Sequence, residues 1–219
     1  MNITGDVYLV GGPSLSDGSD AAIYLVKGKS GSALVDAGTG DGHDRVMKNI
    51  LEAGVRPADI TYIFLTHCHY DHTGGAHLLR SATGARTVAH ELDAEFIETA
   101  DPEVTAASWY RARMEPVKVD VKVETAEARF DAGGTEITMY HTPGHSPGSS
   151  VLTMRSGGAL VLFGQDVHGP LNDSLRSSRA DYVRSLEFLL SLEADILCEG
   201  HFGVFSGRDK VRRFIESFL

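Results

Sequence analysis

Residues 62–72 read YIFLTHCHYDH, an apolar run that ends in four side chains able to bind a metal ion: His67, His69, Asp71 and His72. At this chain's frequencies of His and Asp, the pattern H-x-H-x-D-H would arise by chance about 0.002 times. In extended backbone the side chains at i and i+2 share one face, so His67 and His69 can converge on one ion. A turn into a following helix would carry Asp71 and His72 to a second position nearby. The stretch therefore predicts a strand followed by a loop that can supply ligands to two metal ions.

Two or three ligands do not complete a catalytic site of the zinc type, so more must come from downstream. Three candidates each follow a predicted strand, namely His145, Asp166 and His201. Pro and Gly stiffen the approach to His145, which lies in the run TPGHSPG. A single His or Asp after a strand is more often a turn or cap residue. In this order, and with the upstream motif, the three are better explained as ligands.

Short apolar, β-branched runs alternate with stretches of helical period along the chain, which indicates an α/β protein. Turns expected at residues 27–32, 132–134 and 156–158 favour antiparallel hairpins, so the sheets should be mixed rather than one doubly wound parallel sheet. The strands are expected over residues 7–10, 21–26, 33–36, 62–65, 87–89, 117–123, 137–141, 151–154, 160–163 and 196–198.

Helices are expected over residues 42–53, 75–82 and 181–192, and at the C-terminal end of the chain. The C-terminal helix has one apolar stripe that includes Val211, Phe214 and Ile215. We expect Ser206 to cap its start, with Asp209 three residues later in a variant capping box.

The chain has 219 residues, of which 42% are hydrophobic and 23% charged, and this suits one domain over residues 1–219. No apolar run approaches the ~18 residues of a membrane helix. The formal charge of −10 repels phosphate backbones and anionic lipids, so we expect neither a nucleic acid nor a membrane as partner. Ten histidines against two cysteines favour metal binding or general-base chemistry over a disulfide framework.

The N-terminal residues lack a basic region followed by an apolar one, so we see no secretory signal and expect a cytoplasmic protein. In that reducing compartment Cys68 and Cys198 should be free thiols, although they could still meet in space. The expected partner is a small-molecule substrate, and a homodimer is one assembly that the sequence allows.

The candidate ligands, in their order and context, resemble the five-part signature of the metallo-β-lactamase superfamily of metallohydrolases. The resemblance spans nearly the whole chain. It extends to the run LVDAG at residues 34–38, which is similar to the family's early strand-ending Asp-x-Gly. It implies an α/β fold of a particular kind, a four-layer αββα sandwich in which two mixed β-sheets are flanked by helices and the metals lie at one edge.

The resemblance also implies a role for each candidate ligand. The implied ligands of the first metal are His67, His69 and His145. The implied ligands of the second metal are Asp71, His72 and His201, with Asp166 bridging the two ions. Asp36 would orient a ligand histidine, and its alternative role is that of an ordinary turn residue before glycine.

The implied cofactor is two divalent metal ions, zinc first and iron or manganese as alternatives, because His and Asp ligands suit all three. Two ions about 3.5 to 4 Å apart lower the pKa of a bridging water and give a hydroxide nucleophile without Ser or Cys. The candidate catalytic residues are Asp71 and His168. His168 could contact the substrate or protonate the leaving group, and its alternative role is a surface turn beside Gly169 and Pro170.

The presence of Asp71, His72 and Asp166 makes the chain similar to dinuclear hydrolases such as hydroxyacylglutathione hydrolase (glyoxalase II) and the lactonases. True β-lactamases usually lack the acidic bridge, so we rank that activity low. Two departures weaken the assignment as a glutathione thioesterase. Gln165 stands where the family usually has Gly, and the sequence ends at Leu219 without the additional helical portion that carries glutathione contacts. We therefore expect a small ester-type substrate, a thioester or a lactone.

Persulfide dioxygenases resemble the same scaffold and provide the alternative function. They use a single non-haem iron, which would correspond here to His67, His145 and Asp166. Metal stoichiometry measured together with oxygen uptake would separate the two functions. A nuclease of the superfamily would need a cap domain or a basic exosite, and neither is visible. A binding module would be expected to have lost ligands.

Residues 91–114 interrupt the strand pattern like a helical insert. Because capping segments in α/β enzymes commonly confer specificity, we expect this insert to shape the substrate pocket, with Trp109 and Tyr110 lining it. The alternative is a surface helical pair whose aromatic side chains pack into the core or into a dimer contact.

Overall fold

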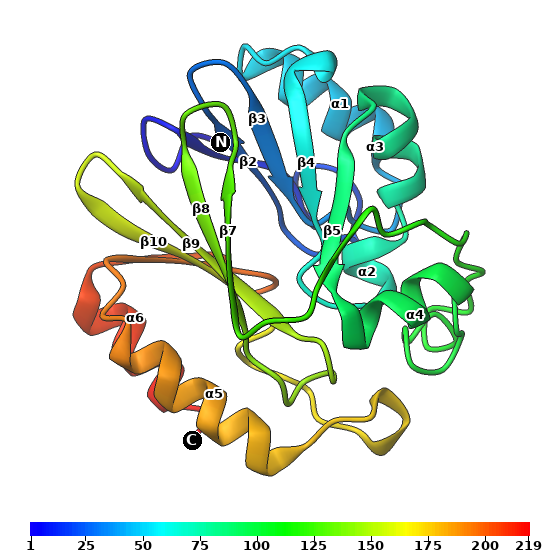
Figure 1. The fold of residues 1–219 in the computed structure, drawn as a ribbon, viewed down its shortest axis with the longest axis vertical. Helices are drawn as coiled ribbons and strands as arrows, with labels where there is room; N and C mark the ends of the chain where they lie inside the picture. Colours follow the sequence, from blue (N-terminus) through cyan, green and yellow to red (C-terminus); the bar gives the residue numbers. More distant parts are fainter.

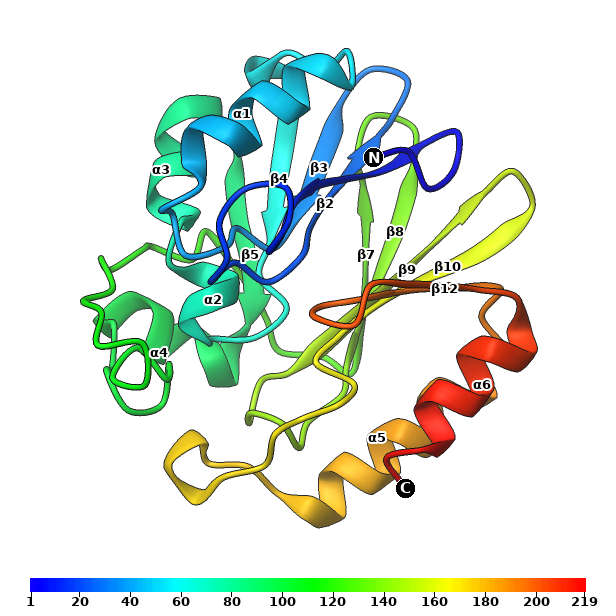
Figure 2. The ribbon, with the colours of Figure 1, turned by 180° about the vertical axis from the view of Figure 1, so that it is seen from behind.

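The computed structural model describes residues 1–219 and places two six-stranded β-sheets face to face, with helices on both outer faces (Figure 1). The view from behind in Figure 2 shows the same four layers. Each sheet is built from one half of the chain. The αββα sandwich that the sequence implied is therefore confirmed.

Both sheets are mixed, as predicted. The first sheet contains, in spatial order, β1 (Val7–Gly11), β2 (Ile23–Lys27), β3 (Ser32–Val35), β4 (Ile60–Phe64), β5 (Arg86–His90) and β6 (Val121–Val123). Its first three strands are antiparallel, and β3 to β6 run parallel. The second sheet contains, in spatial order, β12 (Val204–Ser206), β11 (Ile196–Glu199), β10 (Ala159–Gln165), β9 (Ser150–Ser156), β8 (Glu136–His141) and β7 (Glu127–Asp131). Only the pair β10 and β11 is parallel there.

The helices cover the outer faces of the sheets (Figure 1). The first sheet carries α1 (His43–Glu52) and α3 (Ala76–Thr83), and the second carries α5 (Arg179–Ser191) and α6 (Arg208–Glu216). The short helices α2 (Tyr70–Thr73) and α4 (Glu91–Thr99) lie near one edge of the first sheet, and single 3-10 turns occupy η1 (Pro57–Asp59) and η2 (Asp173–Leu175). None of the helices combines the length and the apolar character that a bilayer crossing requires.

The core has three parts because the central strands are buried on both faces. In β2, Tyr24 and Val26 pack between the sheets, whereas Ile23 and Leu25 pack beneath the helices of the first sheet. The ring of Tyr24 meets that of Phe163 in β10, with centroids 5.6 Å apart. Strands covered on both sides read as continuous apolar runs, which is why they stand out in the sequence.

Every predicted strand is present, with shifted ends, and two further strands were not predicted. Residues 117–120 precede β6 instead of belonging to it. The unpredicted strands, β7 and β12, lie at the two edges of the second sheet, and neither contains a fully buried residue. β7 is mostly polar and β12 has only three residues, so neither gives the long apolar run that marks a buried strand.

Two predictions about where helices begin or end were wrong. Ser206 does not cap α6, because it pairs with Ile196 at the end of β12, and Gly207, at φ 99°, takes the cap position without a side-chain bond. The helical insert expected around residues 91–114 is helical only as far as Thr99, and the next residue, Ala100, adopts a left-handed φ of 51°. Pro102 follows two residues later. Proline disfavours the interior of a helix, because it has no backbone N–H to donate and its ring clashes with the preceding turn. The rest of the insert consists of turns.

Cys68 and Cys198 are free thiols, as predicted, and both are buried. Cys68 packs beneath the helices of the first sheet, whereas Cys198 packs between the two sheets. The two side chains therefore lie in different layers of the core.

The ends of the strands bring the candidate ligands together. β3, β4 and β5 run parallel, so the loops that follow them leave the same edge of the first sheet. In the second sheet β8, β10 and β11 also share one direction, because β8 and β10 are each antiparallel to β9. The loops after β4, β8, β10 and β11 carry all seven candidate ligands.

Candidate metal centre

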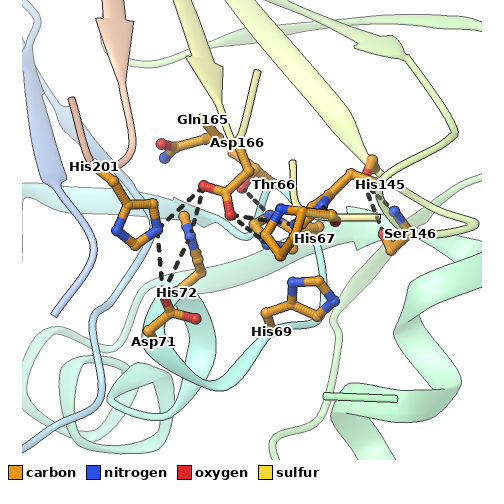
Figure 3. A network of polar contacts seen from close by, with 12 residues as sticks. Thr66, His67, His69, Asp71, His72, His145, Ser146, Gln165, Asp166 and His201 are labelled. Carbon is orange, nitrogen blue, oxygen red and sulfur yellow. Dashed lines mark hydrogen bonds and ion pairs between the residues drawn. The ribbon is translucent and has the colours of Figure 1, made fainter. Parts of the chain in front are cut away.

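The four ligands predicted for the first metal position converge although they come from three loops. The ligand atoms of His67, His69, His145 and Asp166 all lie within 4.8 Å of one another. Figure 3 shows the imidazole rings arranged around the Asp166 carboxylate. His67 and His69 come from the loop after β4, His145 from the loop after β8, and Asp166 from the end of β10.

A second group lies on the other side of Asp166. The ligand atoms of Asp71, His72 and His201 also lie within 4.8 Å of one another. Asp166 Oδ1 faces this group, at 3.1 Å from His72 Nε2 and 3.3 Å from His201 Nε2. Its Oδ2 faces the first group, at 3.2 Å from His145 Nε2 and 3.9 Å from His67 Nε2. Each carboxylate oxygen therefore addresses one of the two groups.

The polar atoms at the centre of this arrangement suit a cation. The buried Nε2 atoms of His67, His69, His72 and His145 make no hydrogen bond, and neither does Asp166 Oδ1. Buried polar atoms without partners are rare, because each costs about 1 to 3 kcal/mol. Imidazole nitrogens and carboxylate oxygens that point at a shared space are the donor set of zinc and of similar transition metals. The residues present therefore fit one or more divalent ions.

The opposite nitrogen of several ligand rings is held by the protein. His72 Nδ1 contacts Asp36 Oδ2 at 2.6 Å, and His145 Nδ1 contacts the carbonyl oxygen of Pro170 at 2.8 Å. The Asp36 carboxylate also accepts hydrogen bonds from the backbone N and the hydroxyl of Thr66, at 2.8 and 2.9 Å. Asp36 thus occupies the orienting position that the resemblance implied. Such contacts fix the tautomer of a ligand histidine and raise its basicity.

Burial and neighbouring charges divide the histidines into two kinds. Burial, and then the neighbouring histidines, lower the pKa of His67 and of His69 well below the usual value. Burial opposes a charge on His201 too, but the carboxylates of Asp166 and Asp71 raise its pKa to about 10. A metal binds the neutral ring, so binding at His201 must displace a proton.

The loop that carries His145 is braced by α5. Gly144 has a φ of 137°, and a Cβ at this position would come within 2.3 Å of the backbone N and Cα of Tyr182. The carbonyl oxygen of Pro143 accepts a hydrogen bond from the hydroxyl of Ser185 at 2.7 Å. Only glycine fits this close approach, which explains Gly144 directly before the candidate ligand His145.

Asp93, on α4, joins two of the ligand loops and was missed in the sequence. Its buried carboxylate accepts hydrogen bonds from the backbone N of Cys68 at 2.9 Å, from the hydroxyl of Ser146 at 2.5 Å and from the backbone N of Gly148 at 2.6 Å. Cys68 lies between two ligand histidines, and Ser146 follows a third. One carboxylate therefore holds a loop of the first sheet against a loop of the second.

Two more buried polar residues support the site without having been predicted. Gln165 donates a hydrogen bond through Nε2 to Asp36, and thereby links β10 to the loop after β3. Glu199 accepts hydrogen bonds from the backbone N atoms of His201 and Phe202, at 2.7 and 2.8 Å. The sequence offered one sign of such residues, which is a polar or charged residue at the end of an apolar strand. Glu199, in the run ILCE, is an example.

The predicted pocket residues lie on the segment that follows α4. Trp109 is 49% exposed and Tyr110 is 40% exposed. The ring of Tyr110 lies 5.5 Å from that of Tyr70, and burial together with the nearby Asp71 raises the pKa of Tyr110. Tyr110 therefore lies beside the second group of ligands, and the exposed side chain of Trp109 is its chain neighbour.

His168 also lies at the metal centre. Its side chain is 17% exposed, and its Nδ1 contacts the carboxylate of Glu199 at 2.8 Å. Its ring centroid lies 5.2 Å from that of His201. The ring is thus held against a ligand histidine, and not solvated as it would be in a simple surface turn.

Two further histidines, His90 and His141, form a stacked pair outside the metal centre. His90, at the end of β5, stacks on His141, at the end of β8, with ring centroids 3.7 Å apart. His90 Nδ1 accepts a hydrogen bond from the backbone N of Leu92 and so caps α4. Burial, and then His141, lower the pKa of His90 to about 4. His90 is therefore neutral at pH 7.

Acid should destabilise the protein through His90. At pH values above about 6.5, His90 is neutral in both the folded and the unfolded chain and contributes no pH dependence. As the pH falls from about 6.5 to about 4, only the unfolded chain binds the proton, so the free energy of unfolding decreases.

We expect His90→Gln to remove on the order of 2 kcal/mol of this decrease. Urea titrations of metal-free protein at two pH values would measure it. His77→Gln, on α3, is the control, and an equal pH dependence in both variants would exclude His90 as the source.

Comparison with known proteins agrees with the fold. A family model described as the metallo-beta-lactamase superfamily matches residues 17–201. A probable metallo-hydrolase of Methanocaldococcus jannaschii is 32% identical over 126 residues, which cover 58% of this chain and 58% of that protein. The chain thus spans little more than half the length of that relative. The acyl-coenzyme A thioesterase MBLAC2 of Homo sapiens is 29% identical over 234 residues, covering 92% of this chain and 80% of that protein.

The fold also matches solved structures. A metallo-beta-lactamase from Cronobacter sakazakii, a variant in its HARLDQ motif, superposes with a TM-score of 0.83 and is 24% identical, covering 99% of this chain and 92% of that one. At this identity the likeness shows the fold alone. The family model, by contrast, covers well over half of the sequence and ends at the candidate ligand His201. The chain therefore belongs to the metallo-beta-lactamase superfamily.

Proposed function

We propose that the protein uses two divalent ions to hydrolyse a small thioester or lactone. The observation that carries this proposal is the position of Asp166, whose two oxygens face two separate groups of ligands. A carboxylate so placed suits two ions that share it as a ligand. Two such ions supply a water of lowered pKa as the nucleophile near neutral pH. Zinc is the metal that we expect, with iron or manganese as alternatives, because His and Asp ligands suit all three.

The chain's own residues position the substrate in this proposal. Because its pKa is raised, Tyr110 keeps its proton and can donate a hydrogen bond to a carbonyl oxygen held beside Asp71. We expect the exposed ring of Trp109, the preceding residue in the sequence, to offer an apolar surface to the substrate. We expect Asp71 and His168 to lie nearest to the reacting bond. Asp71 would be a metal ligand there, and His168 would be held in place by its contact with Glu199.

A thioester is the substrate class that we test first. The human relative is named an acyl-coenzyme A thioesterase, which supports a thioester over a lactone without identifying the acyl group. The formal charge of −10 disfavours nucleic acid, but bound divalent ions would add positive charge where an anionic small substrate must approach. We therefore expect a small molecule as the substrate.

Removal of metal should abolish this activity. Dialysis against a chelator, with metal content verified by elemental analysis, is expected to lower thioester and lactone hydrolysis by at least about 100-fold, because the nucleophile depends on the ions. Addition of zinc, manganese or ferrous iron in separate samples should restore it and identify the preferred metal. Full activity in a verified metal-free sample would exclude the proposal.

The same preparation separates the hydrolase from the alternative oxidoreductase. One iron per chain, together with oxygen uptake that depends on a persulfide and no hydrolysis of any thioester, would replace the hydrolase by a dioxygenase that uses His67, His145 and Asp166. Two ions per chain and hydrolysis without oxygen uptake would support the proposal.

A further inference from the structure

His168 belongs to a third group of convergent side chains, which overlaps the second metal position. A nitrogen of His168 and the ligand atoms of Asp166 and His201 all lie within 4.8 Å of one another. Ligands of one zinc ion, each about 2.1 Å from it, lie roughly 3 to 4 Å apart. The three atoms are therefore within about 1 Å of the spacing that a shared ion requires.

The orientation of the His168 ring is set by a buried carboxylate. Glu199 is fully buried, and its Oε1 contacts His168 Nδ1 at 2.8 Å. Its Oε2 accepts the backbone N atoms of His201 and Phe202, so the carboxylate cannot turn away without losing both bonds. Phe202 packs against the His168 ring, with centroids 4.9 Å apart. The ring is thus held on two sides.

This arrangement matches that of the ligand His72 at the same centre. His72 Nδ1 contacts the buried carboxylate of Asp36 at 2.6 Å, and its Nε2 faces the metal position without a hydrogen bond. His168 Nδ1 contacts a buried carboxylate in the same way. A neutral imidazole that donates through Nδ1 to an ionised carboxylate presents the lone pair of Nε2, which is the form that binds a metal.

We propose that His168 is an additional ligand of a divalent transition-metal ion, through Nε2, at the position shared with Asp166 and His201, and that Glu199 is its positioning residue. The inference rests on the proposed function only in requiring that ions bind at this centre. His201 is the most exposed of the ligands, at 28% of its side chain. An additional imidazole on the same side reduces the dependence of the second ion on that exposed ring.

The test compares His168→Gln with the unchanged protein, both loaded with Co(II) in place of the native metal. Metal affinity is measured by competition with a chelator, and the proton NMR spectrum is searched for exchangeable, paramagnetically shifted signals from the N–H groups of bound imidazoles. We expect the variant to lose one such signal and to bind its weaker ion about 10- to 100-fold less tightly, while the tighter ion is unaffected. His77→Gln, which removes a histidine that belongs to none of the three groups, should change neither measurement.

Glu199→Gln provides a second variant that keeps the His168 ring. The glutamine is a weaker acceptor for Nδ1, so the His168 signal should shift and the weaker ion should bind less tightly, by a smaller factor than in His168→Gln. Circular dichroism checks that both variants are folded.

Two outcomes overturn the inference without touching the proposed function. If His168→Gln keeps every shifted imidazole signal and both affinities within about twofold, His168 is not a ligand. A rise in KM with unchanged metal binding would make it a substrate contact instead. The proposed function fails separately, if the unchanged protein binds ions but hydrolyses neither thioesters nor lactones.

Discussion

Replacement of Asp166 by alanine should lower kcat/KM for the hydrolysed substrate by roughly 1000-fold, since both ions would lose their shared ligand. The metal content should fall from two ions to at most one per chain. The physical reason is that Asp166 Oδ1 faces His72 and His201, while Oδ2 faces His145. No other carboxylate faces both groups of ligands. Elemental analysis and steady-state kinetics on the same sample would measure both effects.

Asp173→Ala is the matched control, because its exposed carboxylate lies on the loop that follows Asp166 and makes no side-chain hydrogen bond. This control should keep two ions and the full rate. Asp166→Asn adds a finer comparison, because it keeps the shape and removes the charge. If Asp166→Ala retained two ions and more than about a tenth of kcat/KM, the shared-ligand explanation of the dinuclear centre would be wrong.

Asp93→Ala should lower the free energy of unfolding of the metal-free protein by about 3 to 5 kcal/mol, because it leaves three buried donors without their charged acceptor. For a chain of this size that corresponds to a decrease in Tm of roughly 10 °C. The donors are the backbone N atoms of Cys68 and Gly148 and the hydroxyl of Ser146. Burial raises the pKa of Asp93, and these donors oppose the rise. Thermal and urea unfolding would measure the loss.

The same substitution should weaken metal binding by about 10- to 100-fold, because two ligand loops lose the contact that sets their distance. Asp93→Asn keeps one acceptor oxygen, so we expect smaller losses of both stability and metal affinity. Glu95→Ala, on the exposed face of α4, is the matched control and should change neither. A variant that lost stability but kept normal metal affinity would limit Asp93 to a structural role.

The sequence was informative wherever one segment carried its own signal. The run from Tyr62 to His72 predicted a strand and the ligand loop without reference to any other part of the chain. Buried strands were found because both of their faces are apolar, as in β2 and β10. The remaining candidate ligands, His145, Asp166 and His201, follow such strands, and the structure brings them close to the residues of the motif.

Features that depend on distant contacts could not be predicted in this way. Asp93 meets Cys68 across 25 residues and Ser146 across 53, and Glu199 meets His168 across 31. No local pattern encodes such partners, because they meet only when the two sheets pack. Ser206 failed as a cap for the same reason, since pairing in β12 decided its position. Short edge strands such as β7 are little buried, so their sequences lack the apolar run by which a buried strand is recognised.

The division of the chain into two half-sandwiches has a consequence for how the protein comes apart. The sheet of residues 7–123 supplies His67, His69, Asp71 and His72, whereas the sheet of residues 127–206 supplies the other three ligands. Ions bound at the centre would fasten one half of the chain to the other like a cross-link. The two halves could then separate only when metal is released, so the lifetime of the folded holoprotein would be limited by the rate of metal dissociation.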